Sequence, residues 1–192
     1  MELLKGAMAL LRVGDPRAMA TDVGPVIDTK ALAALEAHKV YLDSFATKIA
    51  EAPLRMDLTG TYFAPVAYEI DSITRLKGEV FGPILHVIRY AAKDTDMVIS
   101  EINKTGFGLT FGLHSRLLTR FDKMATAVKA GNIYINRSMI GAVVGVQPFG
   151  GQGLSGTGPK AGGPHYLGRF ATEQCISDNT VATGGNVDLL SQ

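Results

Sequence analysis

The alternation of strand-like and helix-like segments between residues 62 and 136 limits the folds that this chain can adopt. Segments rich in β-branched and aromatic residues are typical of strands, and apolar residues repeated every three or four positions are typical of helices. Strands joined by single helices form a largely parallel sheet, so the pattern predicts the α/β fold class. We expect strands at 61–70, 83–92, 109–115 and 132–136. We expect one helix capped by Asp94 or Thr95 that runs through Ile102 and ends near Gly106, and a second at 115–131.

Further elements are expected on both sides of this region. Residues 1–11 and 31–42 repeat their apolar side chains at helical spacing, so both segments are predicted to be helices. Asp28 is a suitable N-cap for the second helix, because its carboxylate can accept a hydrogen bond from an unpaired amide of the first turn. Near the C-terminus we expect a short helix at 164–170 and a strand at 172–180.

The composition excludes several classes of protein. The chain has 192 residues, of which 46% are hydrophobic and 19% charged, with a net charge of +1. This balance predicts a folded domain and gives no reason to expect a nucleic-acid partner. No apolar run approaches the ~20 residues of a membrane span, and no secretory signal is recognisable. The single cysteine, Cys175, suits a reducing compartment, so a cytoplasmic location is expected.

The histidines give no indication of a metal site. His38, His86, His114 and His165 lack ligand spacing and have no cysteine or carboxylate cluster around them. We expect His38 on a solvated helix face, and His86 and His114 within strands. Structural roles are therefore predicted for these side chains, and no metal ligand is assigned.

A glycine-rich stretch at 138–164 includes GQGLSG, which matches the spacing of a dinucleotide-binding loop. Such a loop must be followed by a helix, and the proline and glycine residues after GQGLSG oppose one. The preceding segment IGAVVGVQPF is too apolar for a solvated surface loop. Residue types alone leave two interpretations open: a pocket whose bare amides face a small anionic group, with Phe149 beside it, or a structural turn.

Several motifs together resemble a known family. EVFGP at 79–83, GDPRAMATDVGPVI upstream and GNIYINRSMIGAVVGVQPFGGQGLSGTG downstream resemble the carboxy-terminal part of an aldehyde dehydrogenase. The narrower wording GAVVGVQPFGG followed by GTGPKAGGP is similar to the L-glutamate γ-semialdehyde (pyrroline-5-carboxylate) dehydrogenase module of bifunctional proline utilization A proteins. The resemblance implies that residues 1–164 form the C-terminal portion of an α/β catalytic domain, including an anchor loop at 138–164. Residues 165–192 would then hold an oligomerisation strand and a C-terminal tail.

The resemblance also implies a cofactor and its contacts. NAD is the cofactor that the resemblance implies, and the choice between NAD and NADP is left open. The glutamate that matches Glu79 binds the hydroxyls of the nicotinamide ribose, and a carboxylate can accept two hydrogen bonds from such a diol. The phenylalanine that matches Phe81 packs beside the nicotinamide ring and places it for hydride transfer.

The substrate contacts are implied in the same way. Backbone amides around Gly141 and Ala142 would hold the α-carboxylate of the semialdehyde, and Phe149 would pack on its aliphatic part. Some relatives have a serine at the position of Ala142, which adds a hydroxyl donor that this chain does not have. Under the resemblance, the glycines surround a substrate carboxylate.

The residues that carry out the chemistry in this family do not match any position here. Aldehyde dehydrogenases form a thiohemiacetal on a cysteine, transfer a hydride to NAD and hydrolyse the resulting thioester. Cys175 falls in the expected oligomerisation strand, so no catalytic residue is assigned and the chain alone is expected to be inactive. Two functions remain: part of an NAD-dependent semialdehyde dehydrogenase that needs the remainder of the enzyme and forms a homo-oligomer, or a short non-catalytic assembly module. Whether Met1 is a true start or an internal residue is left open.

Overall fold

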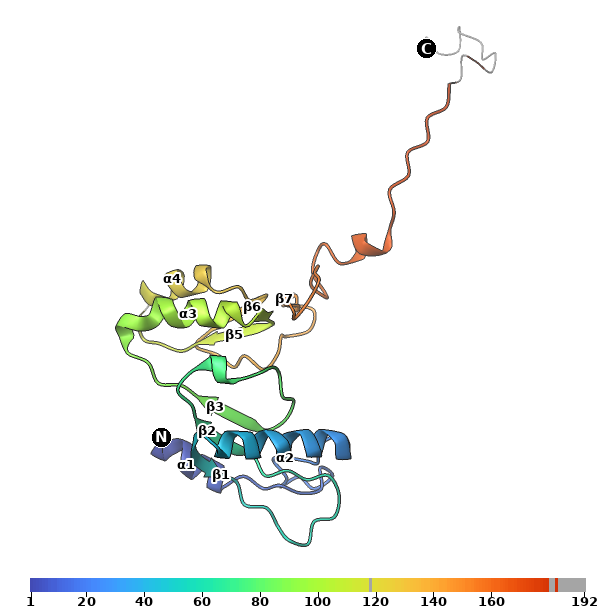
Figure 1. The fold of residues 1–192 in the computed structure, drawn as a ribbon. Coiled ribbons are helices and arrows are strands. Elements are labelled where there is room, and N and C mark those ends of the chain that lie inside the picture. The colour runs from blue at the N-terminus through green and yellow to red at the C-terminus, as the bar shows by residue number, and fades with distance from the viewer. Residues whose placement is uncertain (118, 180–181, 183–192) are drawn as a thin grey trace. The chain divides into compact units, whose positions relative to one another are not determined.

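The structure, a computed structural model, describes residues 1–117, 119–179 and 182, with the backbone alone for 119–121 (Figure 1). The chain divides into two compact units, Met1–Thr105 and Gly106–Gln192, and each is described by itself. Among the described residues, no helix has both the length and the apolarity that a membrane crossing requires.

The first unit contains a three-stranded mixed sheet. Its strands are β1 (Thr47–Glu51), β2 (Val66–Glu69) and β3 (Ile84–Val87), in the order β1-β2-β3. The predicted strands β2 and β3 pair in parallel, whereas β1, which the sequence pattern did not indicate, pairs antiparallel with β2. The prediction of a largely parallel sheet is therefore correct for β2 and β3, while β1 makes the sheet mixed.

Helices and 3-10 turns complete this unit. The predicted helices are present as α1 (Glu2–Ala9), α2 (Thr29–Asp43) and α3 (Thr95–Lys104), and 3-10 turns form at Ile73–Arg75 and Ala92–Asp94. Asp28 caps α2 as predicted, because its Oδ1 accepts a hydrogen bond from the amide of Ala31 at 2.7 Å.

The core of the first unit lies between α2 and the sheet. It consists of six buried side chains: Leu35, Leu42, Phe63, Val66, Tyr68 and Ile70. The Tyr68 hydroxyl donates to Asp43 Oδ1 at 2.6 Å, which satisfies the one polar atom that this ring carries. Burial and the neighbouring Asp43 carboxylate together raise the pKa of Tyr68 above its ordinary value.

The second unit has two short sheets. The predicted strands β5 (Thr110–Leu113) and β6 (Asn132–Ile135) pair in parallel, and α4 (Thr119–Ala127) lies between them in the sequence. Strands β4 (Phe107–Gly108) and β7 (Gln152–Gly153) pair antiparallel, and a 3-10 turn at Leu167–Phe170 occupies the expected short helix. Together with the first unit, these parallel pairs and helices confirm the α/β class.

The segment after the last 3-10 turn forms no strand in the part of the chain that the structure describes. Residues 171–179 are exposed and follow that turn as an extended stretch (Figure 1). The strand predicted at 172–180 therefore has no pairing partner within the described residues, and position 180 lies outside them. Its role as an oligomerisation strand stays a prediction.

Candidate functional site

The predicted cofactor residues lie on the loop that leads into β3. Val80 is half-buried and packs against the core, and Gly82 has φ = 155° and lies so close to the buried Leu35 that a Cβ would collide with that side chain. Alternate residues of the loop are thus fixed against the core. Glu79 precedes Val80, and Phe81 lies between Val80 and Gly82. Both side chains point outward, and Phe81 is 80% exposed.

The exposed groups of this loop are available to a ligand. No hydrogen bond or ion pair joins Glu79 to any residue that the structure describes. A free carboxylate can accept hydrogen bonds from two hydroxyls, and an exposed ring offers a flat apolar face. The two side chains fit the nicotinamide-ribose contacts expected of them.

The predicted substrate residues lie together on one loop of the second unit. The loop follows β6 and turns at Asn136, a residue type that tolerates its φ of 54°. The Asn136 side chain holds this turn, since Oδ1 accepts from the amide of Ser115 at 2.9 Å and Nδ2 donates to the Ser115 carbonyl at 3.0 Å.

Arg137 forms a clip across the loop. Its Nη1 donates to Gln147 Oε1 at 3.0 Å, and its Nη2 donates to the Gly141 carbonyl at 3.2 Å. The same Gln147 oxygen accepts a hydrogen bond from the Val143 amide at 3.0 Å. The guanidinium lies 4.4 Å from the ring centre of Tyr134, which is buried. Side chains 10 positions apart therefore fix the path of residues 138–147.

Asn132 fixes the end of the loop. It is the one buried polar residue among the described side chains, and its Nδ2 donates to the Pro148 carbonyl at 2.9 Å. Its Oδ1 accepts from the Gly150 amide at 3.1 Å and from Lys160 Nζ at 3.2 Å. Phe149, between the two anchored residues, exchanges two backbone hydrogen bonds of 3.0 Å with Ala161.

The amides assigned to the substrate carboxylate are half-buried and unused. Within the described part of the chain, no group accepts a hydrogen bond from the N–H of Gly141 or Ala142. A Cβ built on Gly141 meets no heavy atom within 4 Å, so the space beside this residue is open. Two free donors next to open space can bind an anion.

The glycines that follow have a packing role. A Cβ on Gly151 would collide with Ser155, and one on Gly156 would collide with the Gly151 carbonyl. No helix occurs within residues 154–166, so the helix that a dinucleotide-binding loop requires is not found there. Close backbone packing explains the glycine content of GQGLSG.

Two histidines form a contact that the sequence reasoning missed. His38 of α2 and His86 of β3 have their Nε2 atoms 3.0 Å apart, so one imidazole donates to the other. Burial lowers the pKa of His38, and burial followed by the nearby His38 lowers the pKa of His86. The expected solvated position of His38 is wrong. Its spacing from Leu35 and Leu42, three and four residues, is the signal that could have placed it on the buried face.

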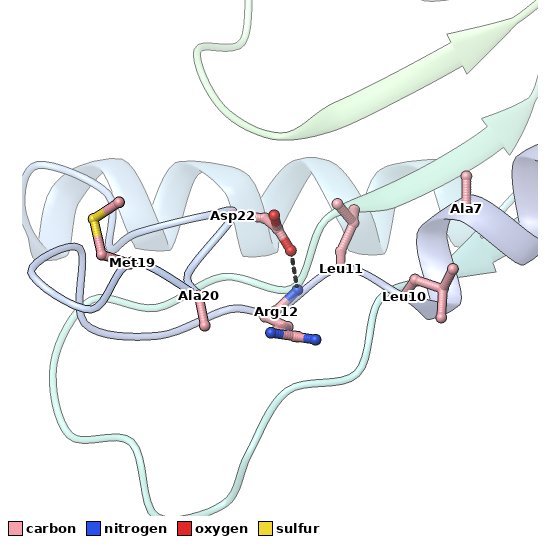
Figure 2. A pocket seen from close by; sticks show the side chains of 7 residues that line it. All are labelled: Ala7, Leu10, Leu11, Arg12, Met19, Ala20 and Asp22. Atoms are coloured by element: carbon pink, nitrogen blue, oxygen red, sulfur yellow. Dashed lines mark hydrogen bonds between the residues drawn. The ribbon is translucent and has the colours of Figure 1, made fainter.

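A pocket of about 450 Å³ lies beside the segment after α1 (Figure 2). The Asp22 carboxylate, which lines it, accepts a hydrogen bond from the Arg12 amide at 2.9 Å. The pocket contains none of the predicted site residues. Among the described residues, no three His, Cys, Asp or Glu side chains are grouped as a metal site would need.

Comparisons with known proteins agree with the resemblance. Residues 1–176 match the aldehyde dehydrogenase family. The chain is 46% identical over 176 residues to the bifunctional protein PutA of Escherichia coli, which covers 88% of this chain and 13% of that protein. It is 36% identical over 159 residues to a 1-pyrroline-5-carboxylate dehydrogenase of Geobacillus kaustophilus, covering 82% of this chain and 30% of the other.

Solved structures give the same result. A variant of Bradyrhizobium japonicum proline utilization A superposes with a TM-score of 0.87 at 51% identity, over 95% of this chain and 19% of that one. A Thermus 1-pyrroline-5-carboxylate dehydrogenase with bound NAD superposes with a TM-score of 0.78 at 32% identity, over 88% and 32% of the two chains. The chain thus spans less than a third of the length of these relatives. It belongs to the aldehyde dehydrogenase family.

Proposed function

We propose that this chain forms part of an NAD-dependent aldehyde dehydrogenase that oxidises L-glutamate γ-semialdehyde to L-glutamate in proline catabolism. The observation that carries the proposal is the 51% identity with a proline utilization A, over 95% of the chain. A match of this extent includes both the loop before β3 and the loop after β6. The chain would supply cofactor and substrate contacts to an active site completed by the remainder of the dehydrogenase.

The cofactor of the proposed enzyme is NAD, which accepts a hydride from the substrate when it is bound. Glu79 would accept hydrogen bonds from the nicotinamide-ribose hydroxyls through a carboxylate that has no partner among the described residues. Phe81 would pack against the nicotinamide ring and restrict its position. Support for NAD also comes from the Thermus relative, whose structure contains it.

The substrate carboxylate is assigned to the loop after β6. The free amides of Gly141 and Ala142 would donate hydrogen bonds to it, and Phe149 would pack on the aliphatic part of the substrate. The two amides are half-buried, which strengthens their interaction with a negative charge. The glycine at 141 leaves the space beside the amides open for the ligand.

The nucleophile and the general base would come from the remainder of the enzyme. Cys175, the single cysteine, is exposed in the extended segment 171–179 and is not assigned a catalytic role. We therefore propose that the chain alone does not oxidise aldehydes. Residues 1–164 would belong to the catalytic domain and 165–192 to the oligomerisation strand and tail of a cytoplasmic homo-oligomer.

A chimeric dehydrogenase tests the proposal. Residues 1–176 of this chain replace the matching segment of Bradyrhizobium japonicum proline utilization A, and oxidation of the semialdehyde is followed as NADH formation. We expect activity from the chimera and none from this chain alone. A chimera that folds, by circular dichroism and size-exclusion chromatography, but does not oxidise the semialdehyde would contradict the proposal.

Gly141→Val in the chimera tests the substrate loop. The structure has room for the added side chain, so the variant should fold, but the side chain would occupy the space beside the two amides. We expect the KM for the semialdehyde to rise at least tenfold, because the loss of a hydrogen bond to a charged group costs about 1.5–3 kcal/mol. Gly168→Ala, also at a site with open space, is the control. Unchanged kinetics in Gly141→Val would refute the assignment of the loop.

A second function is favoured by one observation, the exposed segment 171–179 without a strand partner among the described residues. An unpaired extended segment can add to the edge of another sheet. In this alternative, the chain is a non-catalytic module that assembles with a dehydrogenase. Size-exclusion chromatography of the chain alone distinguishes a module, which gives a defined oligomer, from part of an enzyme, which aggregates.

A further inference from the structure

We propose that Arg137, together with Gln147, is the positioning residue for the substrate carboxylate. The inference rests on the function proposed above and concerns a side chain that the motifs did not single out. The Arg137 guanidinium holds the loop in the form that leaves the amides of Gly141 and Ala142 free, and its positive charge favours an anionic substrate.

One hydrogen bond of Arg137 sets the direction of the Ala142 amide. Arg137 donates to the Gly141 carbonyl, and in a trans peptide the C=O and the following N–H point in opposite directions. The Ala142 amide is therefore directed away from Arg137. The Val143 amide donates to Gln147, whereas the space beside the Cα of Gly141 is open.

The position of the guanidinium is itself well fixed. Its Nε donates to the Ser138 carbonyl at 3.2 Å, in addition to the bonds to Gly141 and Gln147. The buried ring of Tyr134 lies under its face at 4.4 Å from the ring centre, a cation–π contact. Three hydrogen-bond donors and one stacked face fix the position of the guanidinium. Lysine could not reproduce these contacts, because it lacks a planar group with several donors.

The charge of Arg137 has no counterion within the described residues. No Asp or Glu side chain there forms an ion pair with it, and its acceptors are two carbonyls and one neutral amide. A half-buried cation without a carboxylate partner attracts an anion from solvent. The unused amides of Gly141 and Ala142 lie on the same loop, so the positive charge raises the electrostatic potential around an anion that these amides would bind.

Two substitutions in the chimeric dehydrogenase separate the effects of shape and charge. Arg137→Ala removes both the hydrogen bonds that fix the loop and the positive charge. Gln147→Glu retains the oxygens that accept from Arg137 and Val143, but gives the guanidinium a counterion and adds a negative charge to the loop. Arg116→Ala, at an exposed position of the same unit, is the matched control.

The readout compares the semialdehyde with pentanal, which has the same number of carbon atoms and no carboxylate. For Arg137→Ala we expect the KM for the semialdehyde to rise about tenfold or more, with kcat and the kcat/KM for pentanal within about twofold of the parent. Gln147→Glu should raise the same KM about fivefold, and added salt should reduce the difference. A general loss of structure would lower the activity with both aldehydes.

The experiment distinguishes failure of the inference about Arg137 from failure of the proposed function. An active parent chimera whose Arg137→Ala and Gln147→Glu variants retain the preference for the semialdehyde over pentanal overturns this inference and leaves the proposed function standing. An inactive parent chimera counts against the proposed function. In that case, hydrogen exchange of this chain tests the clip directly: the Val143 amide should lose protection in Arg137→Ala and keep it in Arg116→Ala, and equal protection would refute the clip.

Discussion

At the scale of single residues, the His38–His86 contact predicts a dependence of the stability of the first unit on pH. Burial lowers the pKa of both imidazoles in the folded chain, whereas in the unfolded chain they titrate near 6.5. Below pH about 6.5 the unfolded chain binds more protons than the folded chain, so the free energy of unfolding should fall as the pH is lowered. Above that pH both imidazoles are neutral in both states, and this loss of stability should be absent. Urea denaturation between pH 7.5 and about 5 measures this slope.

Replacing one imidazole provides the comparison. His38→Gln can keep a hydrogen bond to His86 but removes one titrating group and the charge that it places beside the other. We expect a smaller loss of stability on acidification than in the parent. His114→Gln, which lies outside the pair, should follow the parent curve. A His38→Gln variant with the parent's pH dependence would show that the pair does not control it.

At the scale of single elements, the loop before β3 makes a second prediction. Gly82→Ala adds a Cβ that collides with the fully buried Leu35, at a φ of 155° that alanine rarely adopts. We expect a loss of about 1–3 kcal/mol in the free energy of unfolding, measured by urea denaturation. Gly78→Ala, in the same loop with open space around it, should change stability by less than about 0.5 kcal/mol. Equal stability of the two variants would contradict the packing described for Gly82.

The elements that could be predicted are those whose own residues carry a strong pattern. The helix after Asp28 has apolar periodicity and a cap that acts locally. Local apolar patterns also indicated the strands β2, β3, β5 and β6. Strand β1, TKIAE, has polar side chains at three of its positions and becomes a strand by pairing with β2. Its register includes an irregularity between Lys48 and Ala50. Pairing with a distant strand leaves little trace in the residues of β1 themselves.

The candidate site shows the same limit. Residue types alone could not decide between a pocket and a turn at 138–164, and the roles proposed for Glu79 and Gly141 rest on the resemblance to a family. Arg137 with Gln147, and Asn132 with Lys160, went unnoticed because their contacts join residues 10 and 28 positions apart. Such contacts follow from the fold of the loop and have no periodic signal in the sequence.

For the whole molecule, the segment after the last 3-10 turn leads to a prediction about folding and self-association. Residues 171–179 are exposed and form no strand in the described part of the chain, so they add little to the packing of either unit. Truncation after Phe170 should therefore leave the thermal midpoint of the chain within about 2 °C of the parent, as measured by circular dichroism. Self-association, measured by light scattering during size-exclusion chromatography, should decrease if the exposed extended segment pairs with a second copy.

A point substitution distinguishes strand pairing from simple exposure of apolar surface. Ile176→Pro removes a backbone donor from the middle of the segment and restricts its φ, so pairing along this segment should be lost as in the truncated chain. Ile176→Ser lowers the apolar area but keeps the amide, and it should associate like the parent if backbone pairing is responsible. If both variants associate like the parent while the truncated chain does not, the contact lies beyond the middle of the segment. A large drop in the thermal midpoint on truncation would instead show that the segment packs on its own chain, and the assembly role would then have no basis.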